Sequence, residues 1–208
     1  MTSAALCIGR IKHSNESLTL NNEPIPWADK LKYLGITFDA KYCLQVNPIN
    51  IKKKFYGALN SILSKSRGSS EPVKLQLVYS FCLPILVYSI GALNFKYTTL
   101  NHLSICWNNA FRAIFGYSSW ESVKELQYFC GYLDIKHLYD LYRFKFLLSV
   151  GSKLPGFVSF FDALELQHHR LAKLRHKYSC SGANIDLMTS AITDHFNKLV
   201  NSSTDPVR

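Results

Sequence analysis

The chain has 208 residues, of which 48% are hydrophobic, and it carries a net charge of +10 with an isoelectric point of about 9.3. This composition supplies enough apolar residues for a packed core and argues against intrinsic disorder. The excess of positive charge favours a polyanionic partner, with nucleic acid ahead of an anionic membrane surface.

The cysteine pattern argues against a disulfide framework. Six cysteines are scattered singly and mostly inside apolar runs: Cys7, Cys43, Cys82, Cys106, Cys130 and Cys180. Such residues are typical of the reduced core cysteines of an intracellular protein. The opening residues MTSAALCIGR lack a basic n-region and a long apolar run, so we expect no signal peptide and a cytoplasmic or nuclear location.

Short strands are expected near the start of the chain. Residues 4-AALCI-8 predict the end of a strand. Two further segments, 17-SLTL-20 and 24-PIPW-27, flank 21-NNE-23, where asparagines tolerate the positive φ of a tight turn. With 31-LKYLGITF-38 as a third strand, the pattern predicts a small antiparallel meander.

Beyond Pro48 the apolar residues recur every three or four positions, which predicts helices. The first of these ends at a turn, 66-SRGSS-70, and Pro72 suits the start of the next. The later helices are expected at about 97–116, 121–129, 134–150, 157–177 and 184–200. The predicted fold is therefore α+β and mainly α, divided into residues 1–46, 47–150 and 151–208.

One uncharged segment has the length of a membrane span. No charged residue lies between Leu75 and Phe95, and lysines flank the run. Polar residues and Pro84 interrupt it, and its first half keeps helical periodicity. A helix buried in a globular core is therefore favoured over a transmembrane helix.

Catalytic motifs are scarce. The sequence contains no GxxxxGK, GxSxG, CxxC or HExxH pattern, and no two of its 14 acidic residues are adjacent. Asp29 and Asp39 are interpreted as turn and strand-end residues. Two-metal phosphoryl chemistry requires clustered carboxylates, which this sequence does not supply in an obvious way.

The sequence does not favour a zinc site. The candidate ligands are His168, His169, His176 and Cys180, whose spacing matches no standard zinc pair. Solvated histidines on a basic helix are the favoured interpretation, so no metal is expected.

Two basic clusters lie on predicted helices. The first contains Lys52, Lys53, Lys54, Lys65 and Arg67, and the second contains Arg170, Lys173 and Lys177. Each cluster alone is commonly a solvated face, but two such faces in a chain of charge +10 favour phosphate contacts. The tyrosines that follow at helical spacing fit either base stacking or, more simply, core packing: Tyr128, Tyr132, Tyr139 and Tyr142.

Four segments in a fixed order resemble one known family. They are 25-IPWADKLKYLGITFD-39, 52-KKKFYGALNSI-62, 80-SFCLPILVYSIGAL-93 and 105-ICWNNAFRAIFG-116. Together they resemble the C-terminal part of the reverse transcriptases of LINE-type (non-LTR, jockey-like) retrotransposons. The resemblance covers about residues 1–150.

The resemblance implies a division of roles. Residues 1–46 would hold the end of the palm and a primer-grip-like hairpin, with Tyr33, Leu34 and Gly35 at the grip. Residues 47–150 would form a helical thumb-like domain, in which the lysines of the first cluster follow a template–primer duplex of RNA and DNA. Residues 151–208 would be a helical extension.

The family's catalytic aspartates are not among these residues. Family order places them before residue 1, so we expect Mg²⁺ only in the complete parent polymerase and no polymerase activity from this chain alone. The expected partners are the duplex and an N-terminal reverse transcriptase portion. The expected function is a nucleic-acid-binding fragment of such a polymerase; the alternative is a non-enzymatic helical protein that binds a protein partner or a membrane.

Overall fold

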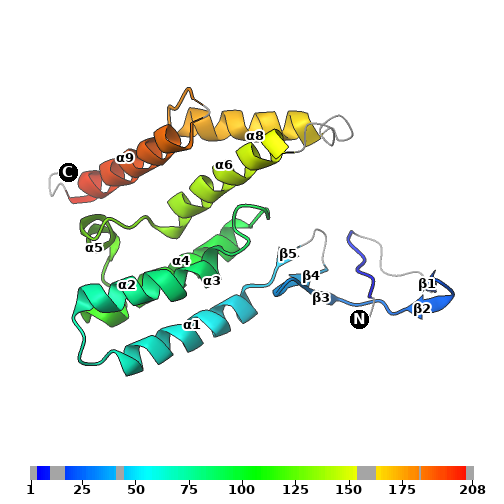
Figure 1. Ribbon diagram of the computed structural model, residues 1–208, viewed down its shortest axis with the longest axis horizontal. Helices are drawn as coiled ribbons and strands as arrows, with labels where there is room; N and C mark the ends of the chain where they lie inside the picture. Colours follow the sequence, from blue (N-terminus) through cyan, green and yellow to red (C-terminus); the bar gives the residue numbers. More distant parts are fainter. Residues whose placement is uncertain (1–3, 10–16, 41–44, 154–162, 183, 205–208) are drawn as a thin grey trace.

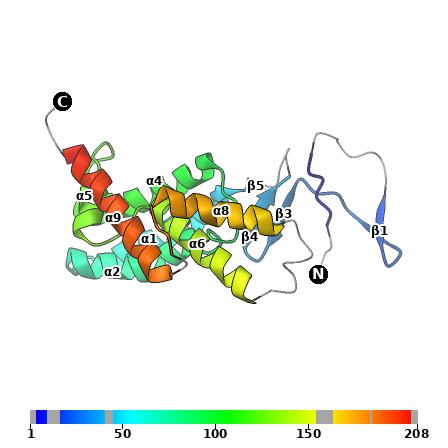
Figure 2. The same ribbon diagram turned by 90° about the horizontal axis from the view of Figure 1, so that it is seen from above.

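The computed structural model describes residues 4–9, 17–40, 45–153, 163–182 and 184–204 (Figure 1). Over these residues the chain is α+β and mainly helical, with a strand pair and a three-stranded sheet before several helices. The predicted fold class is confirmed. Figure 2 shows that the strands lie at one end of the chain and the helices at the other.

The first two strands form a separate hairpin. Strand β1 (Leu18–Leu20) pairs antiparallel with β2 (Glu23–Ile25). Asn21 and Asn22 have φ values of 52° and 65°, as a two-residue type I′ turn requires. The predicted turn is confirmed. The predicted strand at 4–8 is wrong, because this segment contains one isolated bridge, from Ala5 to Trp27.

The second sheet corrects the expected meander. Its strands are β3 (Lys30–Tyr33), β4 (Ile36–Asp39) and β5 (Gln45–Val46), in the order β3-β4-β5. The segment 31–38 is therefore a hairpin and not one strand. The chain reverses at Leu34 and Gly35, whose φ values are 45° and 82°.

The helices follow the predicted order, except that one expected helix is divided into two. They are α1 (Pro48–Lys65), α2 (Glu71–Phe81), α3 (Leu83–Val87), α4 (Tyr97–Phe115), α5 (Lys124–Phe129), α6 (Ile135–Lys153), α8 (Ala163–Lys177) and α9 (Ile185–Thr204). The expected single helix over 75–95 is wrong. It divides at Cys82, because Pro84 has no N–H to donate to the preceding turn. The start expected at 157 for the helix before α9 lies outside the described residues.

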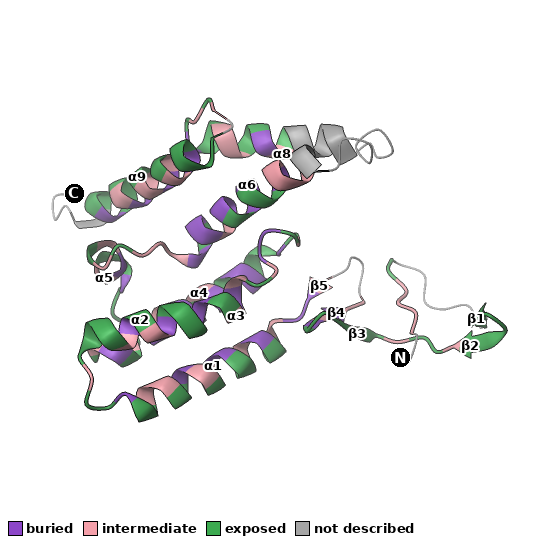
Figure 3. Cartoon of the chain, in the orientation of Figure 1, coloured by how far each residue is buried: buried purple, intermediate pink, exposed green. Residues whose placement is uncertain are grey.

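Two groups of buried side chains form the core, and α6 contributes to both (Figure 3). The larger group joins β4, β5 and helices α1 to α5 around Phe55, Trp107 and Phe111, each fully buried. The smaller group lies between α6, α8 and α9 and includes Phe144 and Met188. The first half of α6 thus belongs to the larger core, and its second half supports α8 and α9.

The uncharged segment contributes to the larger core through Val78, Leu86 and Ile90, which are buried. Across the described residues, the helices are all either too short or too polar to cross a bilayer.

Candidate nucleic-acid interface

The tip of the β3–β4 hairpin is an exposed apolar turn. Tyr33 pairs with Ile36 at the end of the ladder, which leaves Leu34 and Gly35 as the two turn residues. Tyr33 and Leu34 are 61% and 68% exposed. A leucine at positive φ is uncommon, since its Cβ is crowded in that conformation. The turn therefore holds two large side chains in solvent on a rigid support.

A polar network fixes the hairpin to the start of α1. The backbone N–H of Asn47 donates to the carbonyl of Thr37 at 2.8 Å. Asn47 also caps the helix, because its Oδ1 accepts from the backbone N–H of Ile49 at 3.0 Å. Nδ2 of Asn50 donates to Oγ1 of Thr37 at 2.8 Å. These bonds place the first turns of α1 beside β4.

The first basic cluster follows from this placement. A Cβ built on Gly35 would lie 4.0 Å from Nζ of Lys54, so this amine lies beside the hairpin turn. Lys53 is exposed next to it, whereas Lys52 is half-buried. Within the described part of the chain, neither Lys53 nor Lys54 forms an ion pair. Their charges remain free to meet a polyanion.

The remaining residues of that cluster lie at the far end of α1. Lys65 is the last residue of the helix, about 16 Å from Lys54 along the axis, and eleven residues separate positions on nearly the same face. Arg67 follows in the turn, and both side chains are exposed. The first basic cluster is therefore divided between the start of α1, with Lys53 and Lys54, and its end, with Lys65 and Arg67.

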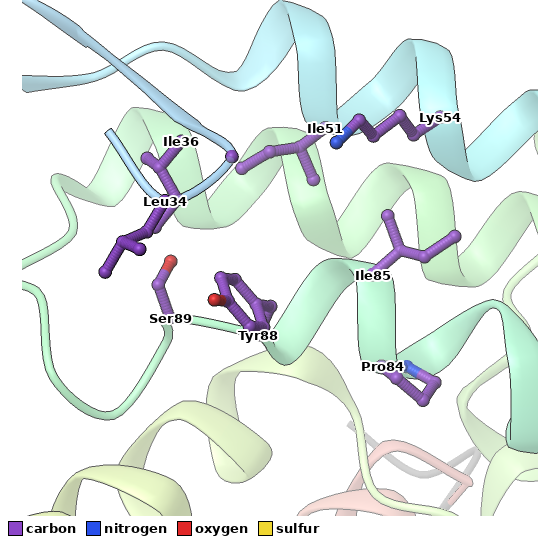
Figure 4. Close-up of a pocket in the computed structure, with 9 residues that line it drawn as sticks. Leu34, Ile36, Ile51, Lys54, Pro84, Ile85, Tyr88 and Ser89 are labelled. Carbon is purple, nitrogen blue, oxygen red and sulfur yellow. The ribbon is translucent and has the colours of Figure 1, made fainter. Parts of the chain in front are cut away.

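An apolar groove of about 330 Å³ lies between the hairpin and α3 (Figure 4). Its lining residues come from the hairpin, α1, and α3 with the two residues after it: Leu34, Gly35, Ile36, Ile51, Lys54, Pro84, Ile85, Tyr88 and Ser89. Lys54 supplies the one charged side chain among them. The sequence analysis did not predict the contribution of Pro84 to Ser89, although these residues belong to a segment quoted for the resemblance.

The second basic cluster lies on α8 and faces α6. Arg170, Lys173 and Lys177 line a second cavity, of about 610 Å³. Nζ of Lys177 forms an ion pair with Oδ2 of Asp140 at 2.5 Å. The sequence analysis missed Arg143, which lines the same cavity from α6.

Two of the four tyrosines proposed for stacking pack against the core. Tyr132 contacts the rings of Trp107 and Phe111 edge-on, and Tyr139 contacts Phe95 in the same way. Burial raises the pKa of Tyr132. For these two tyrosines the core interpretation holds.

The zinc candidates are not assembled into a site. His169 and His176 are exposed and Cys180 is half-buried, and the side chain of His168 lies outside the described residues. Over the part of the chain that the structure describes, no three His, Cys, Asp or Glu residues are grouped to hold a metal. Cys82, Cys106, Cys130 and Cys180 are free thiols.

Comparison of the chain with models of protein families, with curated proteins and with solved structures finds no match.

Proposed function

We propose that this chain is a nucleic-acid-binding module related to the C-terminal part of a LINE-type reverse transcriptase. In this proposal the β3–β4 hairpin serves as the primer grip, and α1 is the thumb helix beside a template–primer duplex. Lys53 and Lys54 contact phosphates near the hairpin, and Lys65 and Arg67 contact phosphates further along. The remainder of the polymerase is the second proposed partner, in the cytoplasm or the nucleus.

One observation carries the proposal: the turn at Gly35 and the amine of Lys54 lie side by side. An exposed turn offers ring and aliphatic surface to a base or sugar, and an adjacent amine offers charge to a phosphate. Backbone contacts of this kind are independent of sequence, as a polymerase subdomain requires.

The test compares duplex binding by a double variant that removes two positive charges with binding by a matched control. Lys53→Gln with Lys54→Gln should weaken binding of an RNA–DNA duplex roughly tenfold, or about 1.4 kcal/mol, as measured by fluorescence anisotropy. Lys124→Gln with Lys198→Gln removes the same charge from exposed positions on α5 and α9 and should weaken binding much less. Equal losses in both variants would contradict the assignment.

We further propose that the chain has no polymerase activity by itself. The family's chemistry uses two Mg²⁺ ions held by aspartates, two of them adjacent, and no adjacent aspartates occur in this sequence. Primer extension with purified protein and Mg²⁺ should give no sustained incorporation. Sustained incorporation would overturn this part of the proposal.

The apolar groove favours a second candidate function, binding of a protein partner. Of its lining residues, Leu34, Ile36, Ile51, Pro84, Ile85 and Tyr88 present apolar surface. A peptide or helix bound there is held by apolar contact, so its affinity should change little with salt. Loss of Lys53, which does not line the groove, should then leave binding unchanged, whereas it should weaken binding of a duplex.

A further inference from the structure

A second cavity, between α6 and α8, has the features of a site for a small anion. It has a volume of about 610 Å³, within the range of ligand pockets in proteins. Its lining residues come from α6, from α8 and from the segment before α4: Asn94, Tyr139, Asp140, Arg143, Arg170, Lys173, Leu174, His176 and Lys177.

Arg143 is the buried cation of this cavity. It is only 7% exposed, and its Nη1 donates to the backbone carbonyls of Gly91 and Ala92 at 3.3 and 3.4 Å. Those bonds satisfy one nitrogen of the guanidinium and supply no negative charge. Burial lowers the pKa of Arg143; Tyr139 opposes this shift, and the positive charge of Arg170 adds to it. A guanidinium nevertheless stays protonated at neutral pH, so Arg143 keeps a buried positive charge that forms no ion pair with a described residue.

The cavity is unbalanced in charge. Among the described residues that line it, four side chains are cationic, from Arg143, Arg170, Lys173 and Lys177, against the one carboxylate of Asp140. One oxygen of that carboxylate is already engaged, because Oδ2 accepts from Nζ of Lys177 at 2.5 Å and from the hydroxyl of Tyr178 at 2.6 Å. Among the described residues, Arg170 and Lys173 have no acidic partner. The described lining residues therefore present a net charge of +3 to the cavity.

Arginine is the side chain best suited to bind phosphate, because its planar donors match two oxygens at once. The second arginine, Arg170, stands on α8 facing the first on α6, and Lys173 lies one turn further along α8. The ring of Tyr139 and the side chain of Leu174 add an apolar wall. Two arginines with an adjacent apolar wall fit a phosphate carried on an organic group.

We propose that this cavity binds a phosphate monoester, with Arg143 and Arg170 as the principal ligands and Lys173 in support. The same chemistry is presented by a free nucleotide and by the 5′-phosphate of a nucleic-acid strand. The site is separate from the hairpin and α1, so it does not depend on the function proposed above.

Calorimetric titration of the full chain with inorganic phosphate, AMP and adenosine tests the site. Phosphate and AMP should bind, and adenosine should not. Binding of one short oligonucleotide is then compared with and without a 5′-phosphate. Affinity for AMP at least equal to that for the phosphorylated strand identifies a free nucleotide as the ligand. A preference of roughly tenfold for the phosphorylated strand identifies a strand end.

The variants separate this site from the duplex interface. Arg170→Gln with Lys173→Gln should abolish phosphate and AMP binding and any preference for the 5′-phosphate. Lys53→Gln with Lys54→Gln should leave phosphate binding intact while weakening both oligonucleotides alike. The Arg170 and Lys173 positions are not fully buried, so this test does not depend on whether an Arg143→Gln variant folds.

Two results would overturn the proposal. One is the absence of phosphate and AMP binding together with equal affinity for the two oligonucleotides. The other is phosphate binding that the loss of Arg170 and Lys173 leaves unchanged, which would mean that Arg143 serves only to support the turn at Gly91.

Discussion

Asn47 and Asp39 join the first helix to the second sheet: Nδ2 of Asn47 donates to both carboxylate oxygens of Asp39, at 3.1 and 3.0 Å. The same side chain caps α1 through its Oδ1, and only 8% of Asn47 is exposed. Together with the bonds of Asn47 and Asn50 to Thr37, these contacts fix the angle between the hairpin and the helix that carries Lys53 and Lys54. The proposed interface depends on this angle.

Replacing Asn47 should weaken both stability and duplex binding. Asn47→Ala removes a helix cap, worth about 1–2 kcal/mol of unfolding free energy, and leaves Asp39 without its donor. Asn184→Ala is the matched control, because Oδ1 of Asn184 accepts from the backbone N–H of Asp186 at the start of α9. Urea unfolding should show a loss of stability in both variants, and anisotropy should show weaker duplex binding only in Asn47→Ala. Equal duplex affinity in the two would separate the hairpin from the interface.

The turn residue Leu34 should be replaceable without loss of stability. Asparagine tolerates positive φ better than leucine does, so Leu34→Asn should raise the free energy of unfolding by up to about 1 kcal/mol. If Leu34 contacts the duplex or a partner, the same variant should bind more weakly. Thermal unfolding and anisotropy on one preparation measure both quantities. A variant that is more stable and binds equally well would remove Leu34 from the interface.

Local patterns in the sequence predict much of this fold. The two asparagines at 21–22 predict the first hairpin, since few residues tolerate positive φ at two successive positions. The positions of α1 and α4 follow from apolar residues at intervals of three and four, and Gly116 ends α4 at a φ of 73°. In each case the determining residues are close in sequence.

The features that the sequence pattern did not predict depend on residues that are far apart in sequence. The residue pattern alone predicted one strand over 31–38, because leucine is rare at positive φ and the surrounding sheet stabilises the turn there. A hairpin was implied at this place only by the family resemblance. Arg143 and Arg170 face one cavity only because the second half of α6 packs against α8. The groove beside Lys54 likewise forms only where the hairpin meets α3. Pattern reasoning identified the basic helices and could not identify what they face.

Gly91 should not tolerate even a methyl group. A Cβ at this position would lie 2.6 Å from the backbone carbonyl oxygen of Tyr142, which is closer than such atoms approach. Gly91→Ala should therefore cost about 1–3 kcal/mol of stability and displace α6 from the turn. Gly57→Ala in α1 is the control, because its Cβ meets no atom within 4 Å, and it should stabilise the chain by about 0.5–1 kcal/mol. Denaturant unfolding distinguishes the two, and a neutral Gly91→Ala would contradict the packing described.

Acid should weaken the contact between α6 and α9. Nδ1 of His137 donates to Oδ1 of Asp134 at 2.7 Å, and its Nε2 lies 3.1 Å from Nδ1 of His195. Only one of these two nitrogens can carry a hydrogen in the contact between the rings. Protonation of both rings would therefore bring two N–H groups together and cause repulsion. Burial, and then the positive charges of His137 and Lys177, lower the pKa of His195.

A pKa lowered by folding means that the unfolded chain takes up the proton first. Stability is therefore full above the ordinary histidine pKa of about 6.5 and falls as the pH drops from there toward the lower pKa of the folded state. Urea unfolding at about pH 7 and about pH 5.5 should show this loss, and His195→Asn should reduce the difference. An undiminished pH dependence in His195→Asn would assign it to other groups.

The salt dependence of duplex affinity tests the central claim most directly. If Lys53, Lys54, Lys65 and Arg67 contact phosphates, each contact releases counterions from the duplex. The logarithm of the binding constant should then fall linearly with the logarithm of the salt concentration, with a slope of about −3 to −4 for four contacts. The Lys53→Gln, Lys54→Gln variant should reduce the slope by about two. A wild-type affinity that hardly changes with salt would contradict the nucleic-acid interface and leave the apolar groove as the functional surface.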